Sequence, residues 1–173
     1  MTHQNMRQQH LPRTFHEEQA AMLSQTVEYA LRAVVQLATI APKASTTADL
    51  AEITQVPPAY LVKVLQSLVK AGIVVSQRGA SGGVSLAGPP QKLTILDIVN
   101  ATDPIERIRT CPLGLSTHGT KLCPLHRRLD AALAQVEAAF RSTTLAEVIS
   151  DPSRIKPLCE TTPKRRTAKA AKA

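Results

Sequence analysis

The chain has 173 residues, a net charge of +8 and 43% hydrophobic residues. This length suits one domain of ordinary size, with or without an appendage, and argues against a second full domain. No apolar run approaches the roughly 18 residues that a membrane span needs, and the first 20 residues lack the apolar stretch of a secretory signal. We therefore expect a cytoplasmic protein that has no membrane partner.

The positive charge is concentrated at one end of the sequence. Residues 154–173 contain seven basic residues and one acidic residue, so they carry +6 of the net +8. The charge alone therefore predicts a basic flexible tail over residues 151–173 and does not establish a basic binding face. Such a tail either adds salt-dependent attraction to phosphates without choosing a sequence, or is a solubilising extension.

The first half of the chain predicts short helices. Residues 1–21 are polar, and we expect a disordered leader there. Apolar residues then recur at helical spacing and predict an amphipathic helix over 24–40, with Gln36 on its polar side. Thr46 and Asp49 resemble a capping pair that opens a short helix to about residue 53. The turn QVPP at 55–58 starts the next helix, because proline is favoured at a first helical position.

A buried stripe, a glycine and a hairpin follow. One apolar stripe is expected to face the core from the helix after QVPP, and its members are Leu61, Val64, Leu65, Leu68 and Val69. Gly72 is suited to end this helix. Short apolar segments at 73–76 and 84–87 predict two strands, and the glycine-rich turn at 78–83 joins them as a hairpin.

The second half begins with a helix capped by Thr94 that ends near residue 101. Residues 105–123 have weak periodicity and contain two of the three cysteines. A long helix with an apolar seam is predicted over 124–141. Thr144 and Glu147 form a capping box for a last short helix that ends near residue 150.

Two short helices across a tight turn, followed by a ribbon, suit duplex DNA, because the second helix can enter the major groove while the ribbon contacts a neighbouring backbone. The exposed side of that helix predicts the contact residues Ala59, Tyr60, Val62, Lys63 and Gln66. The ribbon turn predicts further contacts from Arg78, Gly79, Ser81 and Gly82. The alternative is a structural three-helix unit whose lysines are merely solvated.

Three segments carry a resemblance to a known family. They are QTVEYALRAVVQLA, TTADLAEITQVPPAYLVKVLQSLVKAGIVVSQRGASGGVSLA and LTILDIVNA. The chain resembles, over about residues 22–150, the bacterial winged-helix regulators that include the iron-sulfur cluster regulator IscR and the nitric-oxide-sensitive repressor NsrR. The resemblance implies a mainly α winged helix-turn-helix over 22–103, with a two-stranded β wing at 76–87. It also implies a cysteine loop and dimerisation helix within 104–150, and a homodimer that binds partly palindromic promoter DNA as a repressor. Ala59 and Val62 are apolar where relatives often place polar base-reading side chains, so the sequence preference stays open.

The same resemblance bears on the cysteines. Relatives that bind a cluster usually carry three cysteines, whereas the corresponding segment here, CPLGLSTHGTKLCPLH, contains only Cys111 and Cys123. Thr117 occupies the middle position and His118 follows it. The resemblance then implies an iron-sulfur cluster, with [2Fe-2S] as the favoured type. Its ligands would be Cys111, Cys123 and His118 of one subunit and Glu28 of the partner subunit. His126 is a lesser candidate, and Cys159 is interpreted as a non-ligand.

Other interpretations of these residues stay open. The two thiols could form a redox pair without a cofactor, or be inert, and Glu28 could simply pair with Arg32 one helical turn along. A regulator controlled by a small ligand is a further alternative, and a non-specific nucleoid-type protein is another. An enzyme using Cys111 and His118 is disfavoured, because the sequence has no phosphate loop, no HExxH helix and no CxxC.

Overall fold

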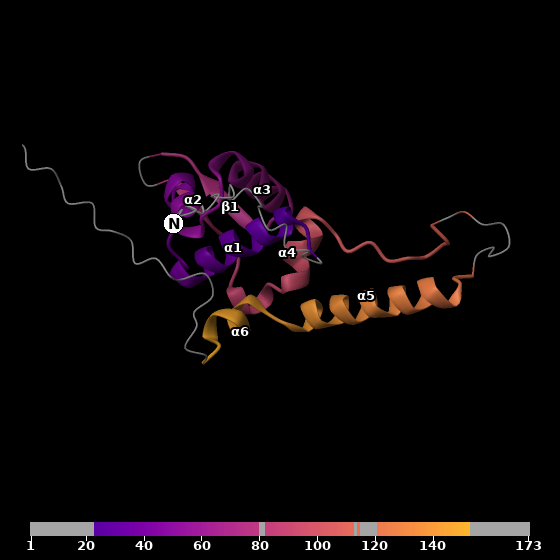
Figure 1. Cartoon of the computed structure of the whole chain (residues 1–173). Coiled ribbons are helices and arrows are strands. Elements are labelled where there is room, and N and C mark those ends of the chain that lie inside the picture. The colour runs from indigo at the N-terminus through magenta and orange to yellow at the C-terminus, as the bar shows by residue number, and fades with distance from the viewer. Residues whose placement is uncertain (1–22, 80–81, 113, 115–120, 153–173) are drawn as a thin grey trace, which may run out of the picture.

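The computed structural model describes residues 23–79, 82–112, 114 and 121–152 (Figure 1). Two predicted site residues, Ser81 and His118, lie outside these ranges, as do the predicted leader and all but the start of the predicted tail. The described elements are α1 (Gln25–Ile40), α2 (Thr47–Thr54), α3 (Pro58–Lys70), β1 (Val74–Gln77), β2 (Gly83–Leu86), the 3-10 helix η1 (Pro90–Lys92), α4 (Ile95–Thr102), α5 (Pro124–Ser142) and α6 (Leu145–Ser150).

Helix α1 is the centre of the core. Its N-terminus is capped by Ser24, whose side chain accepts a hydrogen bond from the backbone N–H of Val27 at 3.4 Å. Helices α2, α3, α4 and α6 and strand β2 all pack against it, so its burial extends round most of its circumference (Figure 1). The prediction that Gln36 lies on an exposed side is therefore wrong, since this side chain is buried between neighbouring elements.

The helix-turn-helix is formed by α2 and α3. Thr46 caps α2 by accepting a hydrogen bond from the N–H of Asp49 at 3.1 Å, and Gln55 ends the helix in the left-handed region at φ +55°. Pro58 begins α3 at a position where no helical N–H bond is lost. Four of the five predicted stripe residues are buried, whereas Val69 is 42% exposed. The prediction for Val69 is wrong, because this residue lies at the edge of the stripe and faces the wing.

The wing is the antiparallel pair of β1 and β2, with Val74 opposite Leu86 and Gln77 opposite Gly83. A third segment joins it, because Ser45 and Val84 exchange backbone hydrogen bonds of 2.9 and 2.8 Å. A Cβ atom at Gly83 would lie 2.6 Å from the carbonyl oxygen of Ser45, so only glycine allows this close approach. The start of β2, close to the wing turn, is thus fixed to the residues that precede α2.

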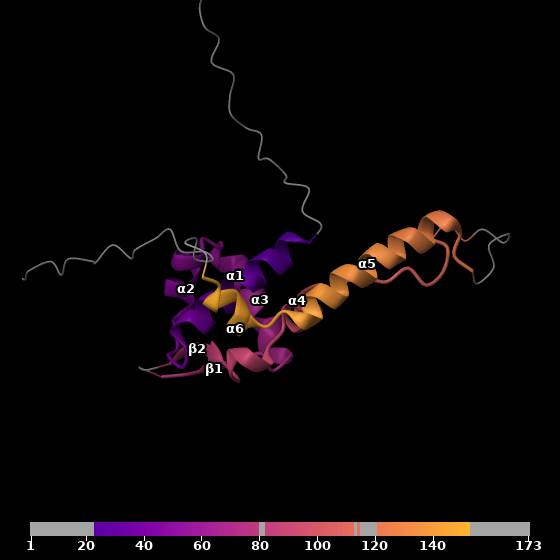
Figure 2. The same cartoon turned by 90° about the horizontal axis from the view of Figure 1, so that it is seen from below.

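The segment after α4 leads away from the body of the molecule, and helix α5 runs back along it towards the body (Figures 1 and 2). The chain then returns to the body as α6, whose Leu145 is fully buried. The N–H of Leu145 donates to the carbonyl of Leu93 at 2.8 Å, and the N–H of Ile95 donates to the carbonyl of Thr143 at 3.0 Å. These contacts anchor the C-terminal end of α5 to the body, while the other end lies far from it.

The predicted fold class is confirmed. The described chain is mainly helical, with a two-stranded antiparallel wing and a long helix near its C-terminal end. None of the described helices combines the length and the apolar character that crossing a bilayer requires.

Candidate nucleic-acid interface

The outer face of α3 is exposed and polar at its centre. Ala59, Lys63, Gln66 and Lys70 are all exposed, and their spacing of three and four residues places them on one face of the helix. The opposite face carries the four buried leucine and valine side chains that hold α3 to the core. The core thus fixes the orientation of α3 and leaves a row of hydrogen-bonding side chains available to a partner.

Tyr60 lies on the flank of α3 that faces α1. Its side chain is 54% exposed, and its ring packs edge-on against Tyr29, with 6.0 Å between the ring centroids and 61° between the planes. Tyr29 follows Glu28 in α1. Through this aromatic pair, the residues around Glu28 contact the predicted reading helix directly.

The wing turn extends beyond β1. Arg78 and Gly79 are exposed, and the N–H of Gly82 donates to the carbonyl of Gly79 at 2.9 Å. Gly79 has φ +114°, and a Cβ atom at Gly82 would lie 2.8 Å from the Gly79 oxygen. The tight turn therefore requires glycine at both positions.

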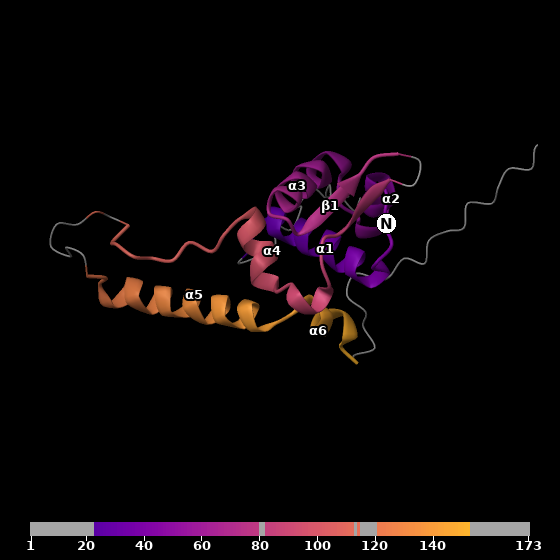
Figure 3. The same ribbon diagram turned by 180° about the vertical axis from the view of Figure 1, so that it is seen from behind.

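Helix α3 and the wing lie side by side (Figures 1 and 3). A groove lies between them. Its volume is about 400 Å³. Val62, Val69 and Val84 supply apolar lining, and Gln66 and Lys70 supply polar lining. The groove thus combines both kinds of side chain next to the outer face of α3.

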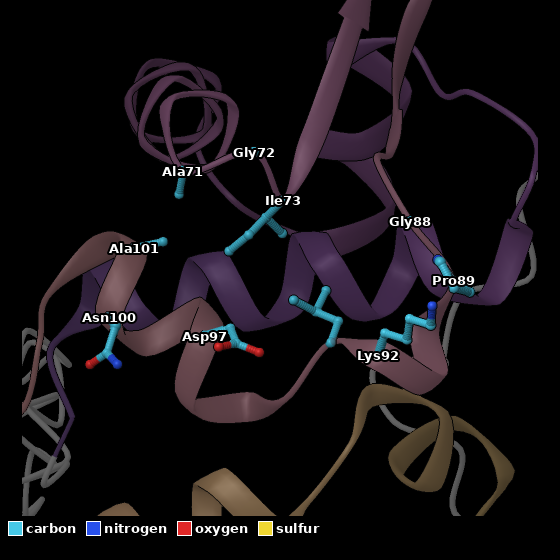
Figure 4. Close-up of a pocket in the computed structure, with 10 residues that line it drawn as sticks. Ala71, Gly72, Ile73, Gly88, Pro89, Lys92, Asp97, Asn100 and Ala101 are labelled. Atoms are coloured by element: carbon cyan, nitrogen blue, oxygen red, sulfur yellow. The ribbon is translucent and has the colours of Figure 1, made fainter.

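A second hollow, of about 430 Å³, lies between the C-terminal end of α3, η1 and α4 (Figure 4). Lys92, Asp97 and Asn100 contribute its polar lining. The carboxylate of Asp97 accepts hydrogen bonds from the N–H and the hydroxyl of Thr94, at 2.9 and 2.7 Å. This carboxylate therefore already serves the capping box that begins α4.

The described cysteines are held differently. Cys111 is buried, and Cys123 occupies the N-cap position of α5, with its Sγ 3.3 Å from Nδ1 of His126. Sequence reasoning ranked His126 below His118, although the Cys-x-x-His spacing at a helix start brings the two side chains together. In the described ranges, no group of three or more His, Cys, Asp or Glu side chains could hold a metal ion.

Glu28 is exposed and paired within its own chain. The Nε of Arg32 donates to its carboxylate at 2.9 Å, as the open alternative expected. An exposed pair of this kind stabilises a helix by only about 0.3–0.5 kcal/mol, so it contributes little to the stability of α1.

An ion-pair network that the sequence analysis missed holds the segment before Cys111 to α5. Arg107 donates two hydrogen bonds of 2.7 Å to the carboxylate of Asp130 and one of 3.1 Å to Glu137. The N–H of Ile108 also donates to Asp130, at 3.0 Å. The bonds from Arg107 hold the pKa of Asp130 below its ordinary value, and the carboxylates raise the pKa of Arg107. The only signal in the sequence was the spacing of seven between the two acidic residues of α5.

The predicted apolar seam of α5 is divided between two environments. Leu125 and Leu129 are 64% and 47% exposed. Leu133 and Val136 are half-buried and line a hollow of about 230 Å³ beside the start of α1 and residues 103–106. The outer half of the seam is thus uncovered, whereas the inner half lies against the same chain.

A helix-turn-helix with a wing and an exposed polar reading face defines a DNA-binding protein of the winged-helix class. Residues 23–151 match the model of the Rrf2 family, described as an iron-dependent transcriptional regulator. The chain belongs to this family, so it is a DNA-binding transcriptional regulator and not an enzyme.

Relatives and solved structures agree with this assignment. A protein of Aquifex aeolicus that is named as an HTH-type transcriptional regulator is 31% identical over 132 residues, which cover 75% of this chain and 92% of the relative. One named in Mycobacterium tuberculosis is 38% identical over 131 residues, covering 73% and 80%. CymR, the global cysteine regulator of B. subtilis, has a TM-score of 0.62 at 25% identity, covering 74% and 95%. IscR of T. potens shares the fold, with a TM-score of 0.63 at 23% identity, covering 78% and 90%.

Proposed function

We propose that this regulator binds a partly palindromic promoter sequence as a homodimer and acts as a repressor. Helix α3 of each subunit enters the major groove, and the wing contacts the neighbouring backbone or minor groove. The observation that carries this proposal is the outer face of α3, where Lys63 and Gln66 are exposed while the opposite face is buried in the core. Residues 22–103 form the DNA-binding part, and residues 104–150 form the sensing and dimerisation part.

The predicted residues take different roles. Lys63 and Gln66 present donors and acceptors that match guanine and adenine edges in the major groove. Tyr60 contacts DNA from the flank of α3, beside its partner Tyr29. Arg78 contacts phosphate, and the wing turn, with Gly79, Ser81 and Gly82, allows the backbone to approach the duplex closely. Ala59 lies in the first turn of α3, where recognition helices usually meet base edges.

Dimerisation through α5 follows from its uncovered apolar side chains. Leu125 and Leu129 are large, exposed and one helical turn apart, as in helices that pack against a second copy. Replacing Leu129 with glutamate places a charge in that seam, so we expect Leu129→Glu to be monomeric in sedimentation equilibrium. Arg128→Glu, which changes charge at the neighbouring exposed position, is expected to remain dimeric.

Selection from a random duplex library tests the function itself. The purified protein is expected to enrich an inverted repeat whose half-sites lie about one helical turn apart. Lys63→Ala and Gln66→Ala are expected to lose that preference, while Lys121→Ala, an exposed lysine distant from α3 in sequence, keeps it. Retention of duplexes without any enriched sequence would instead identify a nucleoid-type protein.

A second proposal concerns sensing through the cysteine segment. The contact between Cys123 and His126 and the burial of Cys111 favour it, because thiolate and imidazole are suitable donors for iron-sulfur centres. The described donors do not make up a complete set. Under this proposal, Cys111, His118 and Cys123 of one subunit bind a [2Fe-2S] cluster, and Glu28 of the partner subunit completes the ligand set. The alternative is a cofactor-free switch in which the two thiols are oxidised, or a regulator with a small ligand.

Iron and acid-labile sulfide analysis of protein isolated without oxygen separates these alternatives. The cluster proposal expects visible absorption that is lost in Cys111→Ser and in Cys123→Ser and retained in Cys159→Ser. Parallel His118→Ala and His126→Ala variants identify which imidazole is required. A colourless, iron-free protein would contradict the cluster and leave the cofactor-free regulator.

A further inference from the structure

Two of the large exposed apolar side chains of the described residues, Val62 and Val69, lie on one flank of α3, where they line the groove beside the wing. Tyr60 lies on the other flank, against Tyr29, and Val75 lies on β1. The remaining two, Leu125 and Leu129, lie on α5 and are explained by a second copy of the chain. Exposed apolar side chains that are grouped usually mark an interaction surface, and the group of Val62 and Val69 lies where the proposed function places DNA.

Val62 is the member of this group best placed to meet base edges. It lies in the first half of α3, directly before Lys63 and one turn before Gln66, and it is 45% exposed. Its side chain lines the groove between α3 and the wing together with Gln66 and Lys70. A cationic side chain, Lys70, therefore borders an apolar surface in this groove, an arrangement that suits a polyanion carrying an apolar group.

The major groove presents one such group, the C5-methyl of thymine. A valine neither donates nor accepts hydrogen bonds. Against guanine or cytosine it would remove water from polar edge atoms without replacing their hydrogen bonds, which is unfavourable. Against thymine it instead buries a methyl group.

We propose that Val62, assisted by Ala59, selects thymine by contact with its methyl group. This inference rests on the proposed function and specifies the sequence that the reading helix prefers. Each half-site then carries thymine opposite Val62. Adenine is expected nearby, because Gln66 can form a paired hydrogen bond with its N6 and N7 atoms.

Replacing thymines by deoxyuridine, one symmetric pair at a time, tests the inference on the selected operator. Deoxyuridine lacks only the methyl group, so hydrogen bonding is unchanged. For the full-length protein, we expect one pair of positions to lose about fourfold in affinity per half-site, about 15-fold for the dimer, as burial of one methyl group predicts. Affinity is measured by fluorescence anisotropy at fixed salt.

Variants connect that effect to the side chain. Val62→Ser is expected to bind the thymine and deoxyuridine operators equally, whereas Val62→Ile retains the difference. Val75→Ser, which changes a valine of similar exposure on β1, is expected to behave like the unaltered protein. Since Val62 is largely outside the core, circular dichroism is expected to show the same fold in all variants.

Two results would overturn the inference. One is an operator that tolerates deoxyuridine at every position, and the other is a Val62→Ser variant with undiminished sensitivity to the missing methyl group. Failure of the proposed function is distinct, because the library selection then yields no sequence-specific duplex at all.

Discussion

The salt dependence of DNA binding measures how many cationic side chains of the protein contact phosphates. Because Lys63 is assigned to base edges, two exposed cationic side chains of α3 and the wing turn are left for phosphates among the described residues, namely Lys70 and Arg78. A dimer presents four such groups. Since each neutralised phosphate contributes about 0.9 to the slope of log affinity against log salt, four of them contribute about 3.6.

Arg78→Ala removes two of these four charges from the dimer. The slope is expected to fall by about 1.8, so that between about 50 and about 200 mM salt the variant loses roughly 12-fold less affinity than the unaltered protein. Base preference is expected to stay the same, because a phosphate contact carries no direct sequence information. The basic tail contributes equally to both proteins and cancels from the difference.

Fluorescence anisotropy with a labelled operator measures the slope. Arg128→Ala is the matched control, because this exposed arginine lies on α5, away from the proposed interface. The reasoning is refuted by an unchanged slope in Arg78→Ala, or by an equal reduction in Arg128→Ala.

Three further predictions concern stability and the tail. Leu145→Ala opens a cavity beneath α6 and is expected to lower the free energy of unfolding by about 2–5 kcal/mol in urea titrations, against about 0.5 or less for the exposed Val75→Ala; equal effects would contradict the anchoring role of α6. Because Arg107 lowers the pKa of Asp130, the stabilisation by that carboxylate is present above its ordinary pKa of 3.8 and is lost as pH falls through the lower folded value. The melting temperature of Asp130→Asn should thus lie below that of the unaltered protein at pH 7 and approach it in acid, whereas a gap independent of pH would exclude this linkage. Deletion of residues 160–173 should reduce the salt slope and leave base preference intact; an altered preference would contradict a non-specific tail.

Local patterns were sufficient to predict the elements of this fold. Helical spacing, capping pairs and Gly72 predicted the boundaries of the described α-helices within one or two residues, since these signals act within a few residues of chain. The short 3-10 helix η1 was not predicted. Gln36 and Val69 were mispredicted because their burial depends on how many neighbours surround α1 and where the wing lies beside α3. The spacing of apolar residues within one helix does not show which distant segments pack against that helix.

The exposed face of α3 was easier to predict from the sequence than the surroundings of the cysteine segment. The exposed residues of α3 followed from the buried stripe, which fixes the opposite face. The Arg107 network was not predictable, because residues 105–112 have no regular period and their position depends on pairing with α5. The contact between Cys123 and His126 depends on where α5 begins. That start was predicted at about Pro124, and His126 was ranked below His118 because it begins this helix, although the same start places Cys123 at the N-cap position beside it.

Photocrosslinking from helix α3 shows directly whether this helix lies in the major groove. Exposed Ala59, on the same face as Lys63 and Gln66, is replaced by p-benzoylphenylalanine, the variant is irradiated on the selected operator, and the attached nucleotides are mapped. We expect two symmetric attachment positions, one in the major groove of each half-site, about one helical turn apart. A probe at position 59 that attaches nowhere, or a probe at position 121 that attaches to the operator as efficiently, would contradict the placement of α3 in the major groove.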